Sequence, residues 1–192
     1  MDTTSQRIMD ATISLIADKG YTATTTKDIA MKAKINESTI FRKFRCKKDI
    51  VMEAMKKDYW KPDFQTDLYP HIIWKLEHDL MMFLFYYLHK VTPDFIKLSI
   101  GLRTPQIYQD TAAYIMDVPD AFIVFLTTYF KEGYQKGLIQ KQNFEQLAMT
   151  LFSATFGFTC LKASFGEAIC AIPDDEYIRE SVRVFIHGLN HT

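Results

Sequence analysis

Two helix-start signals stand close together near the amino terminus, separated by one short helix and a turn. Thr25 is followed three residues later by Asp28, which is the spacing of a capping box. Asn36 is a second residue whose side-chain oxygen can cap a helix by accepting an amide hydrogen bond. Ile35 and Ile40 flank this second cap at the spacing of a hydrophobic staple. The sequence therefore predicts two capped helices joined by a short turn, which is a helix-turn-helix.

The side chains of these two helices separate into an apolar face and a polar face. Ile29, Ala30 and Ala33 recur at helical spacing in the first helix, and Ile40 and Phe44 lie four residues apart in the second. The polar positions of the second helix are Glu37, Ser38, Thr39, Arg42 and Lys43. Short polar groups and cations are the side chains that reach base edges and phosphates in DNA. The pattern indicates a helix that can enter a DNA groove.

Positive charge is concentrated in the same segment. Residues 26–48 hold eight lysine and arginine residues against two acidic ones, a net charge of +6, whereas the whole chain has 23 of each sign. A neutral chain with one basic end is typical of a local contact with a polyanion, beside a second part with another task. The alternative is a solvated charged surface on an ordinary helical domain. The two caps, the staple and the short turn favour the DNA contact.

This stretch resembles the DNA-binding domain of the TetR family of bacterial transcriptional regulators. The residues that match the family pattern are Gly20, Tyr21, Thr24, Thr25, Ile29, Ala30, Ala33, Asn36, Thr39, Ile40, Phe44, Lys47 and Asp49. The rest of the chain matches the family only in length and helical character. The resemblance implies a DNA contact made by Thr25, Thr26, Lys27, Asn36, Glu37, Ser38, Thr39, Phe41, Arg42, Lys43 and Lys47. Within this set we expect Thr25, Lys27, Lys43 and Lys47 at phosphates, and Ser38, Thr39 and Arg42 nearest the bases.

Four positions of the segment depart from the family pattern or from a simple groove contact. Lys34 stands where the family has a turn glycine, and a left-handed backbone there would cost about 1–2 kcal/mol, unless the turn avoids that conformation. Ser38 replaces a glycine, which should favour the helix. Phe41 replaces a tyrosine that contacts a phosphate, so the ring can pack but the hydroxyl contact is absent. Glu37 either accepts from a cytosine amino group or stabilises the positive helix N-terminus, and the second interpretation is favoured.

The composition predicts an all-α fold. Apolar residues make up 48% of the 192 residues, glycine and proline are few, and strand-like alternation is hard to find. We expect about nine helices, in a three-helix DNA-binding domain at 1–50 and an effector-binding and dimerisation domain at 51–192. Gly20 and the prolines are the expected breaks between helices. We expect a first helix at 4–19, the two helices of the helix-turn-helix, a linking helix at 47–60, further helices at 71–90, 93–103, 106–116 and 120–137, and two carboxy-terminal helices.

The chain shows no feature of an exported or metal-containing protein. The amino terminus lacks the basic-then-apolar pattern of a signal peptide, and the longest charge-free run, 146–161, is too short to span a bilayer. Cys46, Cys160 and Cys170 have no metal-like spacing and are odd in number, which favours free thiols in a bacterial cytoplasm. We therefore expect no cofactor, no metal and no membrane partner.

Aromatic residues and methionines recur along the helices of the second part. Such stripes indicate either a dense core or a ligand cavity, and core is the more frequent outcome. The resemblance implies a small, largely apolar effector bound among these helices. The candidate lining residues are Trp60, Trp74, His78, Met81, Phe85, Arg103, Gln106, Tyr108, Phe125 and Tyr129.

The last two helices carry apolar residues at a regular spacing of three and four. The positions are Leu147, Leu151, Ala154, Phe158 and Leu161 on the first helix and Ile178, Val182, Phe185 and Leu189 on the second. This spacing is typical of a helix–helix seam, which lies either within one chain or between two chains. The resembled family forms dimers through these two helices, so we expect this seam to form the dimer interface.

These expectations combine into a homodimeric repressor, released by its effector from a pseudo-palindromic operator. Two recognition helices of such a dimer reach successive major grooves about 34–36 Å apart. One alternative is an architectural or effector-independent DNA-binding protein with a filled core. A helical enzyme is a further alternative, although the five histidines have no metal-like pairing with acidic residues and no nucleophile motif is present. The effector, the operator, the regulated genes and the choice between repression and activation stay open.

Overall fold

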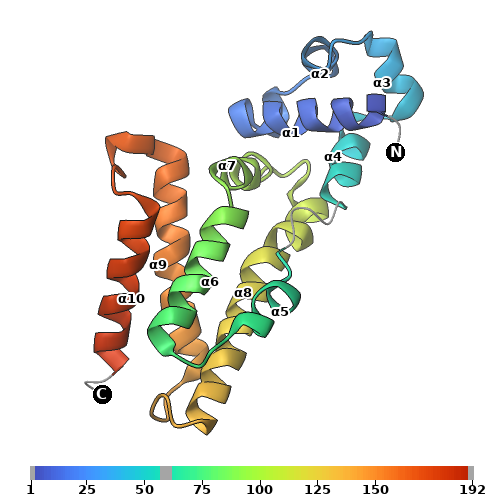
Figure 1. Cartoon of the computed structure of the whole chain (residues 1–192). Helices are drawn as coiled ribbons and strands as arrows, with labels where there is room; N and C mark the ends of the chain where they lie inside the picture. Colours follow the sequence, from blue (N-terminus) through green and yellow to red (C-terminus); the bar gives the residue numbers. More distant parts are fainter. Residues whose placement is uncertain (1–2, 57–61, 190–192) are drawn as a thin grey trace. The chain divides into compact units, whose positions relative to one another are not determined.

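The chain folds into helices joined by short turns, as the composition predicts (Figure 1). The computed structural model describes residues 3–56 and 62–189, in which there are ten α-helices and no strand. The α-helices are α1 (Thr3–Ala23), α2 (Thr26–Lys32), α3 (Glu37–Lys43), α4 (Lys47–Met55), α5 (Phe64–Asp67), α6 (Leu76–Lys90), α7 (Pro93–Gly101), α8 (Tyr108–Gln135), α9 (Phe144–Phe165) and α10 (Asp174–Leu189). Two short 3-10 helices, η2 (Tyr69–His71) and η3 (Gly166–Ala168), complete the list. The all-α prediction is confirmed.

The chain divides into two compact units, which differ from the predicted domains at 1–50 and 51–192. Unit 1 comprises the described parts of residues 1–60 together with residues 93–116, and unit 2 comprises the described parts of residues 61–92 and 117–192. Helix α7 and the first turns of α8 therefore pack with the helix-turn-helix, although more than thirty residues separate them from α4 in sequence.

Unit 1 has one hydrophobic core to which all of its helices contribute. Ile8 and Ile16 of α1 are fully buried, as are Ile29 of α2, Ile40 of α3 and Ile50 of α4. Residues of α7 and of the segment that follows it complete the same core: Leu98, Leu102, Ile107 and Ile115. The predicted packing of the first helix over the helix-turn-helix is thus present, and α7 adds a further layer to it.

The predicted helix boundaries agree with the structure only in part. Gly20 interrupts α1 as predicted, since its φ of 81° and ψ of 162° are not helical, and a short further stretch runs from this kink to Ala23. Helix α4 ends at Met55, and the end predicted at residue 60 lies outside the described residues. Helix α6 begins at Leu76 rather than near His71, since residues 69–71 form η2 and residues 72–75 form no helix.

Pro119 does not end a helix, although the sequence predicted a break there. It lies inside the continuous helix α8. Proline removes one backbone donor, and this loss is offset when the helix buries a face on both sides of it. Ile115, Val118 and Phe122 lie three and four residues apart across the proline, and each is at most 7% exposed. Packing therefore keeps the helix continuous.

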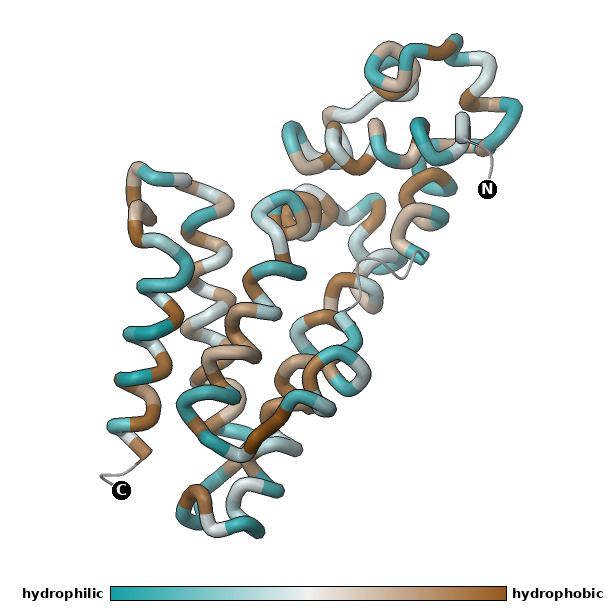
Figure 2. The backbone as a smooth tube through the Cα atoms, in the orientation of Figure 1, coloured by the Kyte–Doolittle hydropathy of each residue, from teal (hydrophilic) through white to brown (hydrophobic). Residues whose placement is uncertain are grey.

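Unit 2 is a helical bundle with an aromatic core. Figure 1 shows α6, α9 and α10 side by side, and α6 contacts both of the others. The buried rings come from four helices and include Phe64, Phe83, Tyr87, Phe122, Phe125, Tyr129, Phe130, Phe152 and Phe158. Helix α10 alternates hydrophobic and hydrophilic residues (Figure 2), and its Ile178 and Val182 are fully buried.

Two helices, α8 and the run 144–168, are long and apolar enough to cross a bilayer by length and composition alone. Both bury a large part of their surface inside this structure, 44% and 39% of the most apolar window. A core helix of a globular protein passes the same test of length and composition.

Candidate nucleic-acid interface

Helix α2 begins with the capping box that the sequence predicted. The Thr25 hydroxyl accepts from the backbone N–H of Asp28 at 3.1 Å, and the Asp28 carboxylate accepts from the backbone N–H of Thr25 at 3.1 Å. Lys19 Nζ lies 2.7 Å from Asp28 Oδ2. Hydrogen bonds from Lys19 and then Thr25 hold the pKa of Asp28 well below its usual range. The start of α2 is therefore fixed to α1.

The turn between α2 and α3 has a left-handed residue at its centre. Lys34 has φ 53°, which carries the strain expected of a residue with a Cβ. Ile35 N–H donates to Ala30 O at 3.0 Å and Lys34 N–H donates to Met31 O at 3.2 Å, which is a Schellman motif. Arg7 of α1 also donates to the carbonyl oxygens of this turn. These bonds hold the turn without the glycine of the family pattern.

The start of α3 differs from the prediction. Asn36 makes no side-chain cap, so that part of the prediction is wrong; only its backbone carbonyl accepts, from Thr39 N–H at 2.9 Å. Glu37 accepts instead from the hydroxyl of Thr26 at 2.5 Å. This bond joins the first residue of α2 to the first residue of α3, where a carboxylate also offsets the positive end of each helix. In this structure, Glu37 therefore holds the start of α3 against the start of α2.

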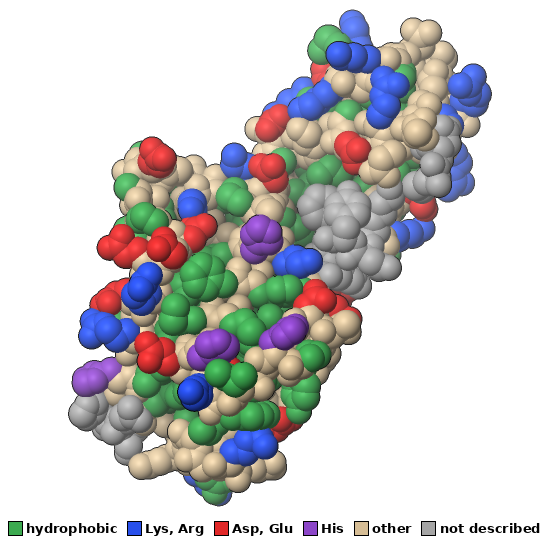
Figure 3. All heavy atoms as spheres, in the orientation of Figure 1, with side chains coloured by type: hydrophobic (Ala, Val, Ile, Leu, Met, Phe, Trp, Pro, Cys, Tyr) green, Lys and Arg blue, Asp and Glu red, His purple; other side chains and the backbone are tan. Residues whose placement is uncertain are grey.

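The outward face of α3 has the residue types and the exposure that a groove contact requires. Ser38, Phe41 and Arg42 are exposed, and Thr39 and Lys43 are half-buried. Ile40 on the opposite face is fully buried. Thr25 and Lys27 at the start of α2 are exposed, and Thr26 is half-buried. Figure 3 shows lysine and arginine side chains spread over this unit of the chain.

Lys47, which the sequence predicts at a phosphate, makes contacts within unit 1 in this structure. Its Nζ donates to the carbonyl oxygens of Tyr21 and Thr24, each at 2.5 Å, and lies 4.0 Å from the centroid of the Tyr21 ring. Burial, and after it the charge of Lys19, lowers the pKa of Lys47. The ammonium group therefore caps the end of α1 and ties α4 to it.

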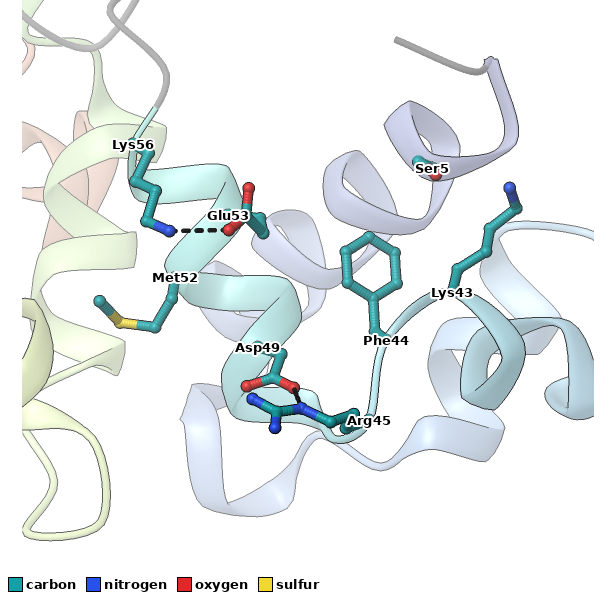
Figure 4. Close-up of a pocket in the computed structure, with 8 residues that line it drawn as sticks. All are labelled: Ser5, Lys43, Phe44, Arg45, Asp49, Met52, Glu53 and Lys56. Carbon is teal, nitrogen blue, oxygen red and sulfur yellow. Dashed lines mark hydrogen bonds and ion pairs between the residues drawn. The ribbon is translucent and has the colours of Figure 1, made fainter.

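A cleft of about 510 Å³ lies beside the carboxyl end of α3 (Figure 4). Its lining residues are Ser5, Lys43, Phe44, Arg45, Asp49, Met52, Glu53 and Lys56. Arg45 forms an ion pair with Asp49 at 3.1 Å and its side chain remains 91% exposed. The sequence analysis did not include Arg45 among the DNA contacts, although it lies in the basic run 42–48 that could have indicated it.

The comparisons with known proteins agree with this geometry. Residues 8–54 match the model for bacterial regulatory proteins of the tetR family. The chain is 31% identical to YvkB, an uncharacterized HTH-type transcriptional regulator of Bacillus subtilis (strain 168), over 99% of each chain. It therefore belongs to the tetR family.

Other tetR-like proteins resemble the chain over nearly its whole length. IcaR, the negative transcriptional regulator of the biofilm operon icaADBC in Staphylococcus aureus (strain Newman), is 23% identical over 88% of this chain and 89% of IcaR. The structure of FadR from Bacillus subtilis in complex with stearoyl-CoA has a TM-score of 0.68 and 18% identity, covering 95% of this chain and 98% of FadR. As a tetR-family member, the chain is a transcriptional regulator with a helix-turn-helix, and these relatives are regulators rather than enzymes.

The predicted effector residues are divided between the two units. Arg103, Gln106 and Tyr108 are exposed residues of unit 1, and the others belong to unit 2 except Trp60, which lies outside the described residues. Phe125 and Tyr129 are core residues, 3% and 2% exposed. The remaining four are at least partly exposed: Trp74, His78, Met81 and Phe85.

Most of the predicted dimer seam packs inside the chain. Leu151, Phe158, Ile178, Val182 and Leu189 are buried at 7% exposure or less. Their regular spacing therefore reflects packing within one chain, which was the alternative to a seam between two chains. Leu147 and Phe185 are half-buried, and Ala154 and Leu161 are exposed.

An apolar groove of about 410 Å³ lies between α9 and α10. Its lining residues are Thr150, Leu151, Ala154, Ile172, Glu176, Tyr177, Glu180, Ser181, Val184 and Phe185. Ile172 and Val184 are 51% and 57% exposed, and Met149 and Leu161 on α9 are 48% and 44% exposed. Large exposed apolar side chains that lie next to one another are typical of interaction surfaces.

Proposed function

We propose that the chain is a homodimeric repressor of the bacterial cytoplasm that binds a pseudo-palindromic operator and is released by a small, largely apolar effector. The exposed polar face of α3 supports the DNA contact, because Ser38 and Arg42 are held outward by the buried Ile40. Arg42 can read guanine in the major groove, and Lys27, Lys43 and Arg45 are the cations that we propose for the phosphate contacts.

The groove between α9 and α10 supports the dimer. It contains exposed apolar side chains of α10 and of the segment before it, including Val184 and Ile172, in a surface that one chain alone leaves in water. Two copies that meet through α9 and α10 form a four-helix contact with two-fold symmetry. Such a dimer presents two α3 helices to half-sites about 34–36 Å apart, or a multiple of one helical turn.

The fold supports an effector, since FadR of Bacillus subtilis, whose fold is similar, has been solved in complex with stearoyl-CoA. A ligand that favours a dimer with a different spacing of its two α3 helices lowers DNA affinity by its differential affinity for the two states. The packing of Phe125 and Tyr129 into the core favours a second candidate. In that reading, the chain binds DNA without an effector and its aromatic core stays filled.

Selection of bound fragments from the source genome tests the DNA contact. We expect enrichment of pseudo-palindromic sites, bound with an affinity that falls steeply with salt. A chain that binds no duplex DNA even in dilute buffer refutes the proposed function. Titration of the DNA complex with a panel of apolar and cationic compounds then separates the two candidates, because only the effector-responsive regulator releases its operator.

A further inference from the structure

One carboxylate in unit 2 is completely buried. Asp79 of α6 has 0% exposure. Its Oδ2 accepts from the Tyr129 hydroxyl at 2.9 Å, and its Oδ1 accepts from the backbone N–H of Ile73 at 3.2 Å and lies 3.2 Å from Nδ1 of His78. His78 is the one possible cation among these three, and its side chain is 55% exposed. The carboxylate is thus held by the Tyr129 hydroxyl, the Ile73 amide and the His78 ring, on a predominantly aromatic wall.

That wall consists of rings from the segment before α6, from α6 itself and from α8. The indole of Trp74 stacks on the Tyr129 ring, with centroids 5.5 Å apart and an angle of 7°. Phe83 meets the Tyr129 ring edge-on at 4.9 Å. Lys136 Nζ lies 4.5 Å from the centroid of the Trp74 ring. A cation already rests on this aromatic group, which is the kind of surface that holds organic ammonium ions.

Trp74 is held in a strained backbone conformation. Its φ is 59°, which bulky residues with a Cβ rarely adopt. Residues 72–75, here called the strap, lie between η2 and α6 and belong to no helix. Strain of this kind persists only where the surroundings enforce it. In the strap, the enforcing contacts are the bond from Ile73 to Asp79 and the stacking of Trp74 on Tyr129.

We propose that Asp79 and Tyr129 form a binding site for an arylalkylammonium ion, which the strap occupies in this structure. Ile73 supplies an N–H donor to the carboxylate, and Trp74 supplies a flat ring to Tyr129. A molecule with an aromatic ring and an ammonium group on a short alkyl chain can offer a ring to Tyr129 and a donor to Asp79, with a full positive charge in place of the amide. The inference rests on the proposed function, because it names the chemical class of the effector.

Binding exchanges the strap for the ligand. Ile73 N–H leaves Asp79 Oδ1 and becomes solvated, while the ligand ammonium donates to that oxygen. The ligand ring takes the place of the indole on Tyr129, and Lys136 moves into water with Trp74. Residues 72–74 move, whereas Lys75 stays in place, because its carbonyl oxygen accepts from Asp79 N–H at 2.9 Å at the start of α6. The hydrogen bonds of α6 and α8 are therefore kept, and the exchange releases the strain at Trp74.

Calorimetry of the full chain without DNA tests the site with two probes of nearly equal shape. The phenethylammonium ion carries the charge, and 2-phenylethanol is its neutral counterpart. We expect the cation to bind at least roughly tenfold more tightly, since the buried carboxylate gains a charged partner. Equal affinity of the two probes overturns the proposal.

Two variants locate the site. Asp79→Asn keeps the shape of the side chain and removes its charge, so the preference for the cation should disappear, whereas Glu167→Gln, at an exposed position in η3, should leave it unchanged. Trp74→Gly accepts the positive φ without strain and removes the competing ring. It should bind phenethylammonium several-fold more tightly. A cation preference that survives Asp79→Asn, or a Trp74→Gly variant with unaltered affinity, contradicts the proposed site.

The operator complex provides a separate measurement. Release of operator by phenethylammonium but not by 2-phenylethanol supports the site as the effector site. Binding of the cation to a chain that keeps its operator refutes the effector assignment while the site itself stands. Failure to bind any DNA refutes the proposed function alone, because the calorimetric comparison uses no DNA.

Discussion

Gly101 of α7 lies directly against the backbone of Ile16 in α1. A Cβ atom at Gly101 would stand 2.4 Å from the carbonyl oxygen of Ile16 and 3.2 Å from its Cγ2. Both residues belong to unit 1. This close approach is what brings α7, distant in sequence, into the core of the helix-turn-helix unit.

Gly101→Ala should therefore separate α7 from α1 and destabilise the chain by about 1–3 kcal/mol, the range for overpacking in a filled core. Urea unfolding followed by circular dichroism measures the loss. Gly133→Ala is the matched control: its new Cβ would meet only ordinary contacts at 3.9 Å, and alanine favours a helix interior by about 1 kcal/mol. Equal stability of the two variants would contradict the role of Gly101.

Lys47→Ala should destabilise unit 1 by about 1.5–3 kcal/mol, since hydrogen bonds from a charged group to the carbonyls of Tyr21 and Thr24 are lost. Lys27→Ala serves as the comparison, because Lys27 is exposed and placed for a phosphate. It should leave the melting temperature unchanged and reduce the salt slope of DNA binding by about one. The assignment fails if Lys47→Ala changes only DNA affinity.

Arg42→Ala should relax sequence preference at one base step by about 1–3 kcal/mol, because Arg42 is an exposed cation on α3. Competition between the selected operator and single-base variants of it, followed by fluorescence anisotropy, measures the change. An equal loss of affinity on every sequence would contradict a base contact and would indicate that Arg42 contacts a phosphate.

Val184→Glu should produce monomers that keep their fold, because it places an unpaired charge in the apolar groove beside Glu176 and Glu180. An uncompensated buried charge weakens an interface by about 3–5 kcal/mol. Phe185→Asp is a less selective test, since the Phe185 ring lies 5.9 Å from that of the buried Phe130 and its loss also damages the core. Sedimentation velocity distinguishes monomers from dimers. If the Val184→Glu chain still dimerises, this groove is not the dimer interface.

Acid should loosen the start of α2. The folded chain holds the pKa of Asp28 below its ordinary value of 3.8, chiefly through Lys19, so the unfolded chain binds a proton more readily. This contribution to stability is present above the ordinary pKa and is lost as the pH falls below it. Unfolding of Asp28→Asn should accordingly depend less on pH below about pH 5 than unfolding of the natural chain. Parallel pH dependences would exclude Asp28 as a source of the effect.

The helix-turn-helix was predictable because its signals are local. The Thr25–Asp28 capping box, the helical spacing of Ile29 and Ala33, and the polar face of α3 each depend on residues within one or two turns. Local signals did not determine the backbone conformation of Lys34. Its left-handed backbone was one of two alternatives, and the bond from Arg7 that supports the turn joins residues far apart in the chain.

Tertiary structure decided the features that depend on partners distant in sequence. The spacing of Ile178 and Val182 is the same for a seam within one chain and for a seam between chains. Only the folded structure, in which both residues are buried and α10 contacts α6, shows a seam within the chain. The basic run predicts Lys47 as a phosphate contact, and only the folded chain shows that its ammonium group also donates to the carbonyl oxygen of Tyr21 in α1. Residue patterns thus determined which faces are apolar or charged, and the three-dimensional packing determined what each face meets.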